Sequence, residues 1–331
     1  MTLDVGSQHD LAPSEARSNG SRVFVNGNLA RSLAAAFRVT GNATYLREAL
    51  RWCDSMLRVM MPVLDSRGRP AAYWGTGGHV PAGPIYLGDT GTAAAAIAMI
   101  SRHAPAAARE RYVGALRKFF RFVMNGTQAP PPGGFSHNRT QASPGWQLPN
   151  GAFGAGYFVG NLTLTPYTVS TATTGMSFAS SLCGALEHVE RTRSAEDVDA
   201  TTLCEGDRVA LRASAWLSSI VLPSAAGTNA GVIPYCWLGT CYANNDSYGG
   251  LNSYLNNAAY VADGIVAMDQ RSTDGARATL LRQFRPVVMH LCDTQHGNGS
   301  WGVPMGTDQQ RSHRLAAIWD VTVAAAQKLG G

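Results

Sequence analysis

Lysine and long apolar runs are what this sequence most clearly lacks. Only two of the 27 basic residues in the 331-residue chain are lysines, so the net charge of +5 is carried almost entirely by arginine. The arginines are scattered and form no basic cluster, which argues against a nucleic-acid partner. No apolar run of about eighteen residues occurs, so we predict no membrane span. Residues 1–20 also lack the apolar segment of a secretory signal.

Metal-binding cysteine patterns are absent as well. The six cysteines form no Cys-x-x-Cys pair and no cysteine–histidine spacing typical of structural zinc, and we expect neither a metal nor a cofactor. Cys236 and Cys241 flank a Trp-Leu-Gly-Thr loop, a spacing that a local disulfide can close, so we predict that bridge. Cys53 and Cys183 lie in apolar helical patterns typical of buried free thiols. The sequence leaves open the pairing of Cys53, Cys183, Cys204 and Cys292.

Acceptor tripeptides for N-linked glycans are abundant. Seven of the fifteen asparagines stand in the pattern Asn-x-Ser/Thr without an intervening proline, whereas chance predicts about two. Each marks a candidate glycan on an exposed loop, and together they predict a secreted, extracellular glycoprotein. The alternative is a protein of a GC-rich bacterial genome in which the tripeptides are never used. The candidate glycosylation sites are Asn19, Asn42, Asn125, Asn138, Asn161, Asn245 and Asn298.

A helical hairpin recurs along the chain. Apolar residues at helical spacing in 26–60 predict two antiparallel helices that turn at Thr40–Asn42. A second pair begins at Gly88, where Asp89 has the position of an N-cap that accepts free amide protons of the first turn. A helix over 208–222 is predicted as the second member of a third pair.

Small residues distinguish the first helix of each pair. They concentrate at Ala34–Ala36 and Ala93–Ala96, and further pairs begin near Thr174 and Asn252. Small side chains permit close backbone approach on two sides, as an inner ring of helices requires. We therefore predict a single all-α domain over 1–331, an α/α toroid of four to five helical hairpins. An irregular α-helical array is the alternative.

Long loops rich in glycine, proline and aromatic residues separate the hairpins. They occupy 62–88, 127–172 and 223–252, and each precedes a predicted inner helix. We therefore expect the long loops on one face of the toroid, where they are functional or cover the ring. Short strands are compatible with alternating segments such as Gly156–Leu164. Residues 1–24 are predicted as an extended N-terminal segment.

Two motifs carry a resemblance to a known group of proteins. They are the segment TGNATYLREALRWCD at Thr40–Asp54 and Gly-Asp-Thr-Gly-Thr at 88–92. Through them the chain resembles the α/α-toroid carbohydrate-active proteins, notably unsaturated glucuronyl hydrolases and toroidal polysaccharide lyases. The resemblance implies a toroidal fold and a polysaccharide or oligosaccharide partner.

Candidate catalytic residues follow from the two reactions of that group. Glycoside hydrolysis needs two carboxyl groups across a sugar, yet 127–172 contains none, which leaves Asp89, Asp246 and Asp308. A plain helix cap without catalytic function is the alternative for Asp89, and turn formation explains Asp246 as readily as catalysis does. A lyase needs a base, a proton donor and a group that stabilises an enolate. The candidates for both reactions are Asp89, Asp246, His79, Tyr248, His313 and Arg314.

Aromatic rings in the loops offer flat faces on which sugars can stack. Packing of the loops onto the helices is the alternative explanation for them. In the predicted inner helices, Asp263 and Asp320 need a partner such as Arg31 or Arg314 if they are buried. The candidate substrate-binding residues are Trp74, Tyr86, His137, Trp237 and Trp301.

These features favour a secreted glycoside hydrolase or polysaccharide lyase that acts on an extracellular polysaccharide, acidic or neutral. A different class of function competes with it. The shortage of acids in the loops, together with many glycan sites, fits a non-catalytic structural glycoprotein of a cell surface, matrix or filament, assembled as a homo-oligomer. The sequence leaves the substrate, the reaction and the oligomeric state open.

Overall fold

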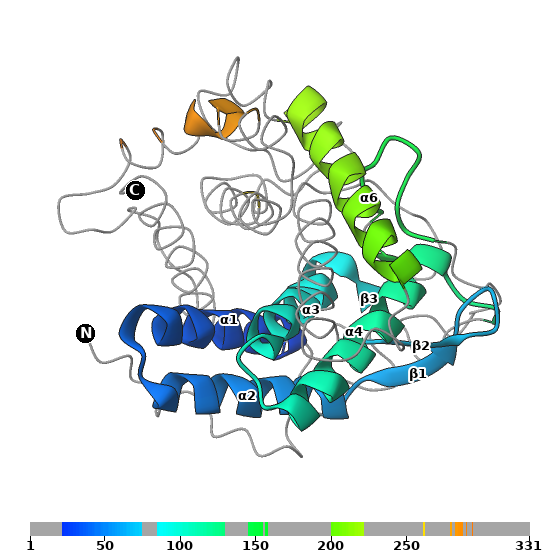
Figure 1. Cartoon of the computed structure of the whole chain (residues 1–331). Helices are drawn as coiled ribbons and strands as arrows, with labels where there is room; N and C mark the ends of the chain where they lie inside the picture. Colours follow the sequence, from blue (N-terminus) through cyan, green and yellow to red (C-terminus); the bar gives the residue numbers. More distant parts are fainter. Residues whose placement is uncertain are drawn as a thin grey trace.

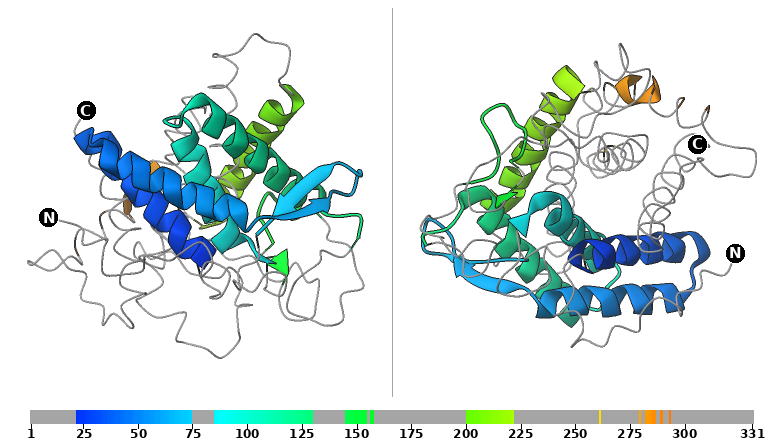
Figure 2. Two further views of the ribbon diagram at one scale, coloured as in Figure 1. Left: turned by 90° about the horizontal axis from the view of Figure 1, so that it is seen from below. Right: turned by 180° about the vertical axis from the view of Figure 1, so that it is seen from behind.

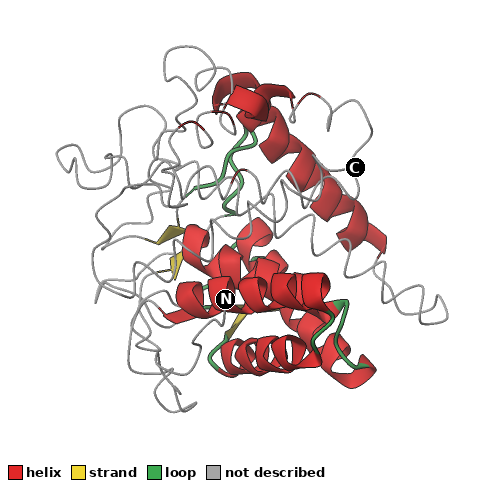
Figure 3. Ribbon diagram, turned by 90° about the vertical axis from the view of Figure 1, so that its left-hand side faces the viewer, coloured by secondary structure: helices red, strands yellow, loops and turns green. Residues whose placement is uncertain are grey.

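The computed structural model describes the first two helical hairpins and part of the third. Within the described residues the chain is mainly α-helical, as predicted, with four short strands (Figure 3). The described residues are 22–74, 85–129, 145–154, 156–157, 200–221, 261, 279, 282–286, 289 and 293.

The first hairpin has the predicted form. Helices α1 (Arg22–Thr40) and α2 (Ala43–Arg58) lie side by side (Figure 1). Gly41 turns the chain with a φ of 69°, which glycine adopts without strain. Asn42 then caps α2, because its side chain accepts a hydrogen bond from the Thr44 amide at 2.9 Å. Helix α1 begins inside the segment 1–24 that was expected to be extended.

The second hairpin is also confirmed, and part of the third is visible. Helices α3 (Leu87–Ser101) and α4 (Ala106–Asn125) follow one another across a short turn. Helix α6 (Ala200–Trp216) begins before the predicted residue 208 and continues as the π-helical segment η3 (Leu217–Val221). The predicted partner of α6 near Thr174 lies outside the described residues.

Burial separates two kinds of helix. Helices α1 and α3 pack against each other, α2 packs mainly on α1, and α4 packs on α3 (Figures 1 and 2). Ala93–Ala96 of α3 are all buried, and so are Ala34–Ala36 of α1. By contrast, α2 and α4 alternate buried and exposed residues in the pattern of one-sided surface helices. The small-residue helices are therefore internal, as the sequence predicts.

Gly27 sets the closest approach between the two internal helices. A Cβ atom added there would lie 2.9 Å from the Ala93 backbone nitrogen and 3.1 Å from the Thr92 carbonyl carbon. These are backbone atoms, so they cannot move aside without displacing α3. The α1–α3 contact thus depends on the absence of a side chain at this one position.

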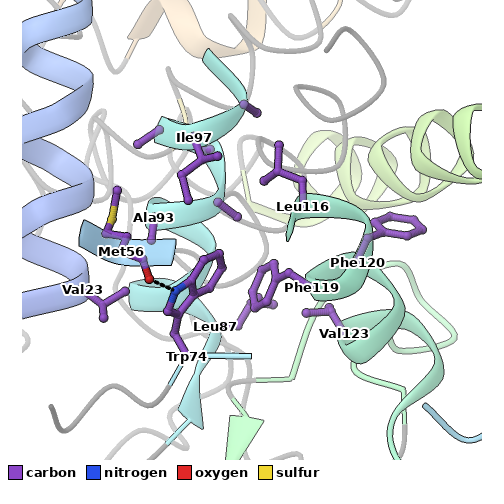
Figure 4. Close-up of a cluster of buried hydrophobic side chains, with 14 of the residues drawn as sticks. Val23, Met56, Trp74, Leu87, Ala93, Ile97, Leu116, Phe119, Phe120 and Val123 are labelled. Carbon is purple, nitrogen blue, oxygen red and sulfur yellow. Dashed lines mark hydrogen bonds between the residues drawn. The ribbon is translucent and has the colours of Figure 1, made fainter. Parts of the chain in front are cut away.

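Aromatic residues fill the space between the helices and the neighbouring strands. Trp74 packs against Phe119 with ring centroids 4.9 Å apart, and Tyr73 stacks on Phe122 at 5.0 Å. The Trp74 indole nitrogen donates a hydrogen bond to the Met56 carbonyl at 2.9 Å (Figure 4). These contacts join α2, α4 and the strand before Trp74 into one core.

Part of the predicted loop 62–88 forms regular structure. Strands β1 (Met61–Leu64) and β2 (Pro70–Tyr73) make an antiparallel hairpin. Strand β3 (Ile85–Tyr86) pairs with β4 (Gly156–Tyr157), the start of the alternating segment in which short strands were considered. The rest of that segment lies beyond the described residues.

Residues 145–154 contact both the second hairpin and α6. The Gln147 side-chain amide donates to the Val209 carbonyl at 3.0 Å, and the Arg212 guanidinium donates to the Leu148 carbonyl at 3.1 Å. Trp146 of the same segment is buried against Phe122. Side chains far apart in sequence thus hold α6 beside the first two hairpins.

Asp65 organises the turn between β1 and β2 and ties it to the end of α4. Its fully buried carboxylate accepts hydrogen bonds from the amides of Arg67 and Arg69, from the Arg69 guanidinium, and from the Asn125 side chain at 3.0 Å. Desolvation raises the pKa of this carboxyl, but the hydrogen bonds outweigh it and the net pKa is lowered. We call this arrangement the Asp65 clamp.

In the described part of the chain, no helix combines the length and apolar character that crossing a bilayer requires.

Replacing Gly27 with alanine should destabilise the protein although alanine favours helices. The new methyl group would push the backbones of α1 and α3 apart, so we expect the free energy of unfolding to fall by about 1–3 kcal/mol. Urea denaturation followed by circular dichroism measures the change. Gly114→Ala in α4 is the matched control, because its added Cβ meets nothing within 4 Å, and it should stabilise by about 0.5–1 kcal/mol. Equal effects at the two positions would contradict the close approach.

Replacing Asp65 with asparagine should lower stability at neutral pH and much less in acid. The lowered pKa means that the carboxylate contributes stability above the unfolded pKa of about 3.9, and that this contribution is lost as pH falls through the lower folded value. We expect the free energy of unfolding of the variant to be about 2–3 kcal/mol below that of the wild type at pH 7, and the difference to be smaller in acid. Urea midpoints of both proteins, measured from pH 7 to pH 2, test this prediction. A stability difference that does not change with pH would contradict it.

Candidate functional site

Asp89, the first predicted catalytic residue, lies in the first turn of α3. The helix begins at Leu87, so Asp89 is its third residue, and the prediction that it is the N-cap is wrong. The reason is that β3 pairs with β4 and leads directly into α3, which starts the helix earlier. A negative charge in a first helical turn is still favoured by the helix dipole.

Trp74 belongs to the core and not to an exposed sugar-stacking surface. Its side chain has no exposed area, its ring packs at a tilt against Phe119, and its indole nitrogen donates a hydrogen bond to the Met56 carbonyl. A ring that stacks on a pyranose needs an open face. The structure therefore corrects the substrate-binding assignment of Trp74 in favour of packing, the alternative that the sequence left open.

The remaining predicted site residues are placed only in part. Tyr86 is the last residue of β3, paired with Gly156 and adjacent in the chain to the start of α3. The others lie outside the described residues: Asp246, His79, Tyr248, His313 and Arg314 of the catalytic set, and His137, Trp237 and Trp301 of the substrate-binding set.

Asn26 is a buried polar residue that sequence reasoning missed. It is 4% exposed, and its side-chain oxygen accepts no hydrogen bond. Its neighbour Gly27 touches α3 at Thr92 and Ala93, so Asn26 lies beside the first turns of α3. A buried acceptor without a partner costs free energy, and a bound ligand or water would recover it. The available signal was the Asn-Gly-Asn run at the start of the repeat.

Two buried threonines place further hydroxyl groups at the start of α3. Thr90 and Thr92 have no exposed area. The Thr92 hydroxyl donates to the Gly88 carbonyl at 2.8 Å, one turn earlier in the helix. With Asn26, the first turns of the two internal helices therefore carry several polar groups within an otherwise alanine-rich contact.

Helix α1 carries two more buried polar residues. Arg31 is 4% exposed, and Ser32 is 8% exposed with a hydroxyl that makes no hydrogen bond. The acids expected to accompany Arg31, Asp263 and Asp320, lie beyond the described residues. A buried guanidinium supplies positive charge and hydrogen-bond donors of the kind that hold carboxylates.

The described polar groups are suited to binding hydroxylated ligands. They comprise amide and hydroxyl groups and one guanidinium, whereas no group of three or more His, Cys, Asp or Glu side chains in the described part of the chain could hold a metal ion. We call Asn26, Arg31, Thr90 and Thr92 the inner-helix cluster. Its members share two neighbouring helices.

The cysteine predictions are tested at one position. Cys53 is a fully buried free thiol in α2, as predicted, and burial together with the nearby Asp54 raises its pKa. Cys236 and Cys241 lie outside the described residues, so their disulfide stays a prediction.

Two of the seven acceptor asparagines fall in the described residues. Asn42 is exposed at the hairpin turn before α2, whereas Asn125 is a partly buried member of the Asp65 clamp. The other five lie outside this part of the structure: Asn19, Asn138, Asn161, Asn245 and Asn298.

Comparison with known proteins gave no family: no family model matches the chain, and no curated protein shows significant sequence similarity to it.

Replacing Asn26 with leucine should leave the fold intact. Leucine has a similar branched shape and removes an acceptor that has no partner, so we expect the free energy of unfolding to stay within about 1 kcal/mol of the wild-type value or to rise. Urea denaturation tests this, with Ser32→Ala as a control at a second unpartnered group. A loss well above that range would show that the amide has a structural partner.

Proposed function

We propose that the chain is a secreted α/α toroid that acts on an extracellular polysaccharide, as a glycoside hydrolase or a polysaccharide lyase. The observation that carries the proposal is the alternation of buried, small-residue helices α1 and α3 with one-sided helices α2 and α4. A ring of hairpins requires this alternation, because each inner helix has neighbours on both sides while each outer helix has one face in solvent.

The inner-helix cluster supports a binding site at the starts of the inner helices. Gly27 and Ala93 meet in the second turns of α1 and α3, so the two helices begin at the same end of the contact. Sugars offer many hydroxyl groups, and an unpartnered amide oxygen such as that of Asn26 accepts from one of them.

Asp89 is the catalytic residue that we assign within this arrangement. It lies in the first turn of α3, and we assign it the role of nucleophile or general base. In a hydrolase, Asp246 is the second carboxyl and donates the proton. In a lyase, a histidine or tyrosine from His79, Tyr248 and His313 abstracts the proton beside a uronate carboxylate, and Arg314 stabilises the enolate.

Replacing Asp89 with asparagine separates catalysis from folding. The change keeps the volume and removes a charge near the helix dipole, so stability should fall by no more than about 1 kcal/mol, whereas turnover should fall by roughly two orders of magnitude or more. Reducing ends and the absorbance of unsaturated products, measured over uronate-containing and neutral glycans, report the two reactions.

Glu48→Gln is the matched control for that experiment. It exchanges a carboxylate for an amide on the outer helix α2, where Glu48 pairs with Arg51, and should leave turnover unchanged. Full activity in Asp89→Asn would remove its catalytic role. Wild-type protein inert on every glycan would refute the enzymatic proposal.

A non-catalytic glycoprotein is the second candidate, and one observation favours it. Residues 127–172 contain no acid, so the described loop segment 145–154 supplies no carboxyl for hydrolysis. In this case the toroid would be a rigid building unit of a surface or filament. Light scattering and electron microscopy distinguish the two, because a strictly monomeric protein would exclude the assembly role.

A further inference from the structure

The acceptor tripeptide at Asn42 is fully accessible. Asn42, Ala43 and Thr44 are all exposed at the tip of the first hairpin. The Asn42 side-chain oxygen accepts the capping hydrogen bond from the Thr44 amide, and its side-chain nitrogen makes no hydrogen bond within the described part of the chain. The nitrogen that a glycan would occupy is therefore available while the cap is formed.

The acceptor tripeptide at Asn125 has the same sequence pattern but the opposite environment. Asn125 is the last residue of α4, Gly126 is buried with a φ of 69°, and Thr127 is 3% exposed. The Thr127 hydroxyl donates to the Ala129 carbonyl at 2.6 Å, and Thr127 forms a β-bridge with Asp65. The tripeptide is thus fixed at a helix end and paired with another segment.

The Asp65 clamp also uses the nitrogen that glycosylation needs. The Asn125 side-chain nitrogen donates to Oδ2 of Asp65 at 3.0 Å, and that carboxylate has no exposed area. Oδ2 also receives the Arg69 guanidinium at 3.1 Å. A sugar ring bonded to this nitrogen would have to fit against the buried carboxylate and its partners.

We propose that folding decides between the two tripeptides: Asn42 carries an N-linked glycan, and Asn125 is a structural residue that the Asp65 clamp withholds from glycosylation. In the transfer, the asparagine side-chain nitrogen bonds to the anomeric carbon of an oligosaccharide carried on a lipid diphosphate. The carbon–oxygen bond to the diphosphate breaks, and the nitrogen gives up one of its two protons. This proposal rests on the proposed secretion, and it differs from the prediction of a glycan at Asn125.

The structure also explains why a glycan at Asn42 is compatible with the fold. The capping bond uses the side-chain oxygen, which glycosylation leaves unchanged, and the remaining atoms of the side chain face solvent. The stability of α2 should therefore be insensitive to the glycan. Asn42 also lies at the turn end of the first hairpin, opposite the starts of α1 and α3, so a glycan there leaves the inner-helix cluster uncovered.

Site occupancy in protein secreted from glycosylating eukaryotic cells tests the proposal. The full chain is directed to secretion by an added signal peptide, so the outcome does not depend on where the native protein resides or on what it catalyses. Release of glycans by an amidase in heavy-oxygen water, followed by peptide mass spectrometry, reports each asparagine. We expect Asn42 occupied in most molecules and Asn125 in none. A glycan on Asn125 of the secreted protein, or an unmodified Asn42, would overturn it.

Two variants keep the mechanism testable. Thr44→Ala destroys the first tripeptide but retains the cap, since the bond uses the Thr44 backbone amide; it should lose the Asn42 glycan with no shift in urea midpoint. Asp65→Ala releases the Asn125 side chain and should gain a glycan there. Both secreted and intracellular pools are analysed, so a variant that folds poorly still gives a result. Asn125 unmodified in both pools would show that the clamp is not the cause.

Discussion

The backbone contact between α1 and α3 is the constraint on which the described structure depends. Gly27 lies against Thr92 and Ala93 without a side chain between them, and the adjoining alanines are buried. Protein interiors are packed as densely as organic crystals, so even one added methyl group disturbs the packing. With the internal pair fixed at this separation, α2 and α4 can cover it, each with a single apolar face.

Polar contacts on the outer side fix the positions of the covering helices α2 and α4. The Tyr112 hydroxyl of α4 lies 3.0 Å from Oδ1 of Asp54 and 3.2 Å from the Leu50 carbonyl, and Arg111 pairs with the same carboxylate. These contacts join α4 to α2 across solvent-facing surface. The buried Asp65 clamp joins the far end of α4 to the turn between β1 and β2, and its hydrogen bonds are stronger because they are shielded from water. The apolar core sets the spacing of the helices, and these polar contacts set their register.

The inner-helix cluster follows from the same arrangement. Gly27, the neighbour of Asn26 in α1, lies against Thr92 and Ala93 of α3, although more than sixty residues separate the two segments in the chain. Sequence reasoning selected Asp89 as a candidate because an acid before an alanine run is a local signal. It missed Asn26, because burial without a partner is a property of the packed structure.

The sequence by itself determined the helices, the turn at Gly41 and the buried thiol of Cys53, since each depends on periodicity or on one residue's backbone preference. Only the tertiary structure decided what Trp74 and Asn125 do. From the sequence, Trp74 is an aromatic residue of a loop; in the structure it packs against Phe119 and donates a hydrogen bond to the Met56 carbonyl. The tripeptides at Asn42 and Asn125 have the same sequence pattern, but the Asn125 side chain donates a hydrogen bond to Asp65, sixty residues away. Long-range partners, which local patterns do not encode, set the difference between an exposed group and a buried one.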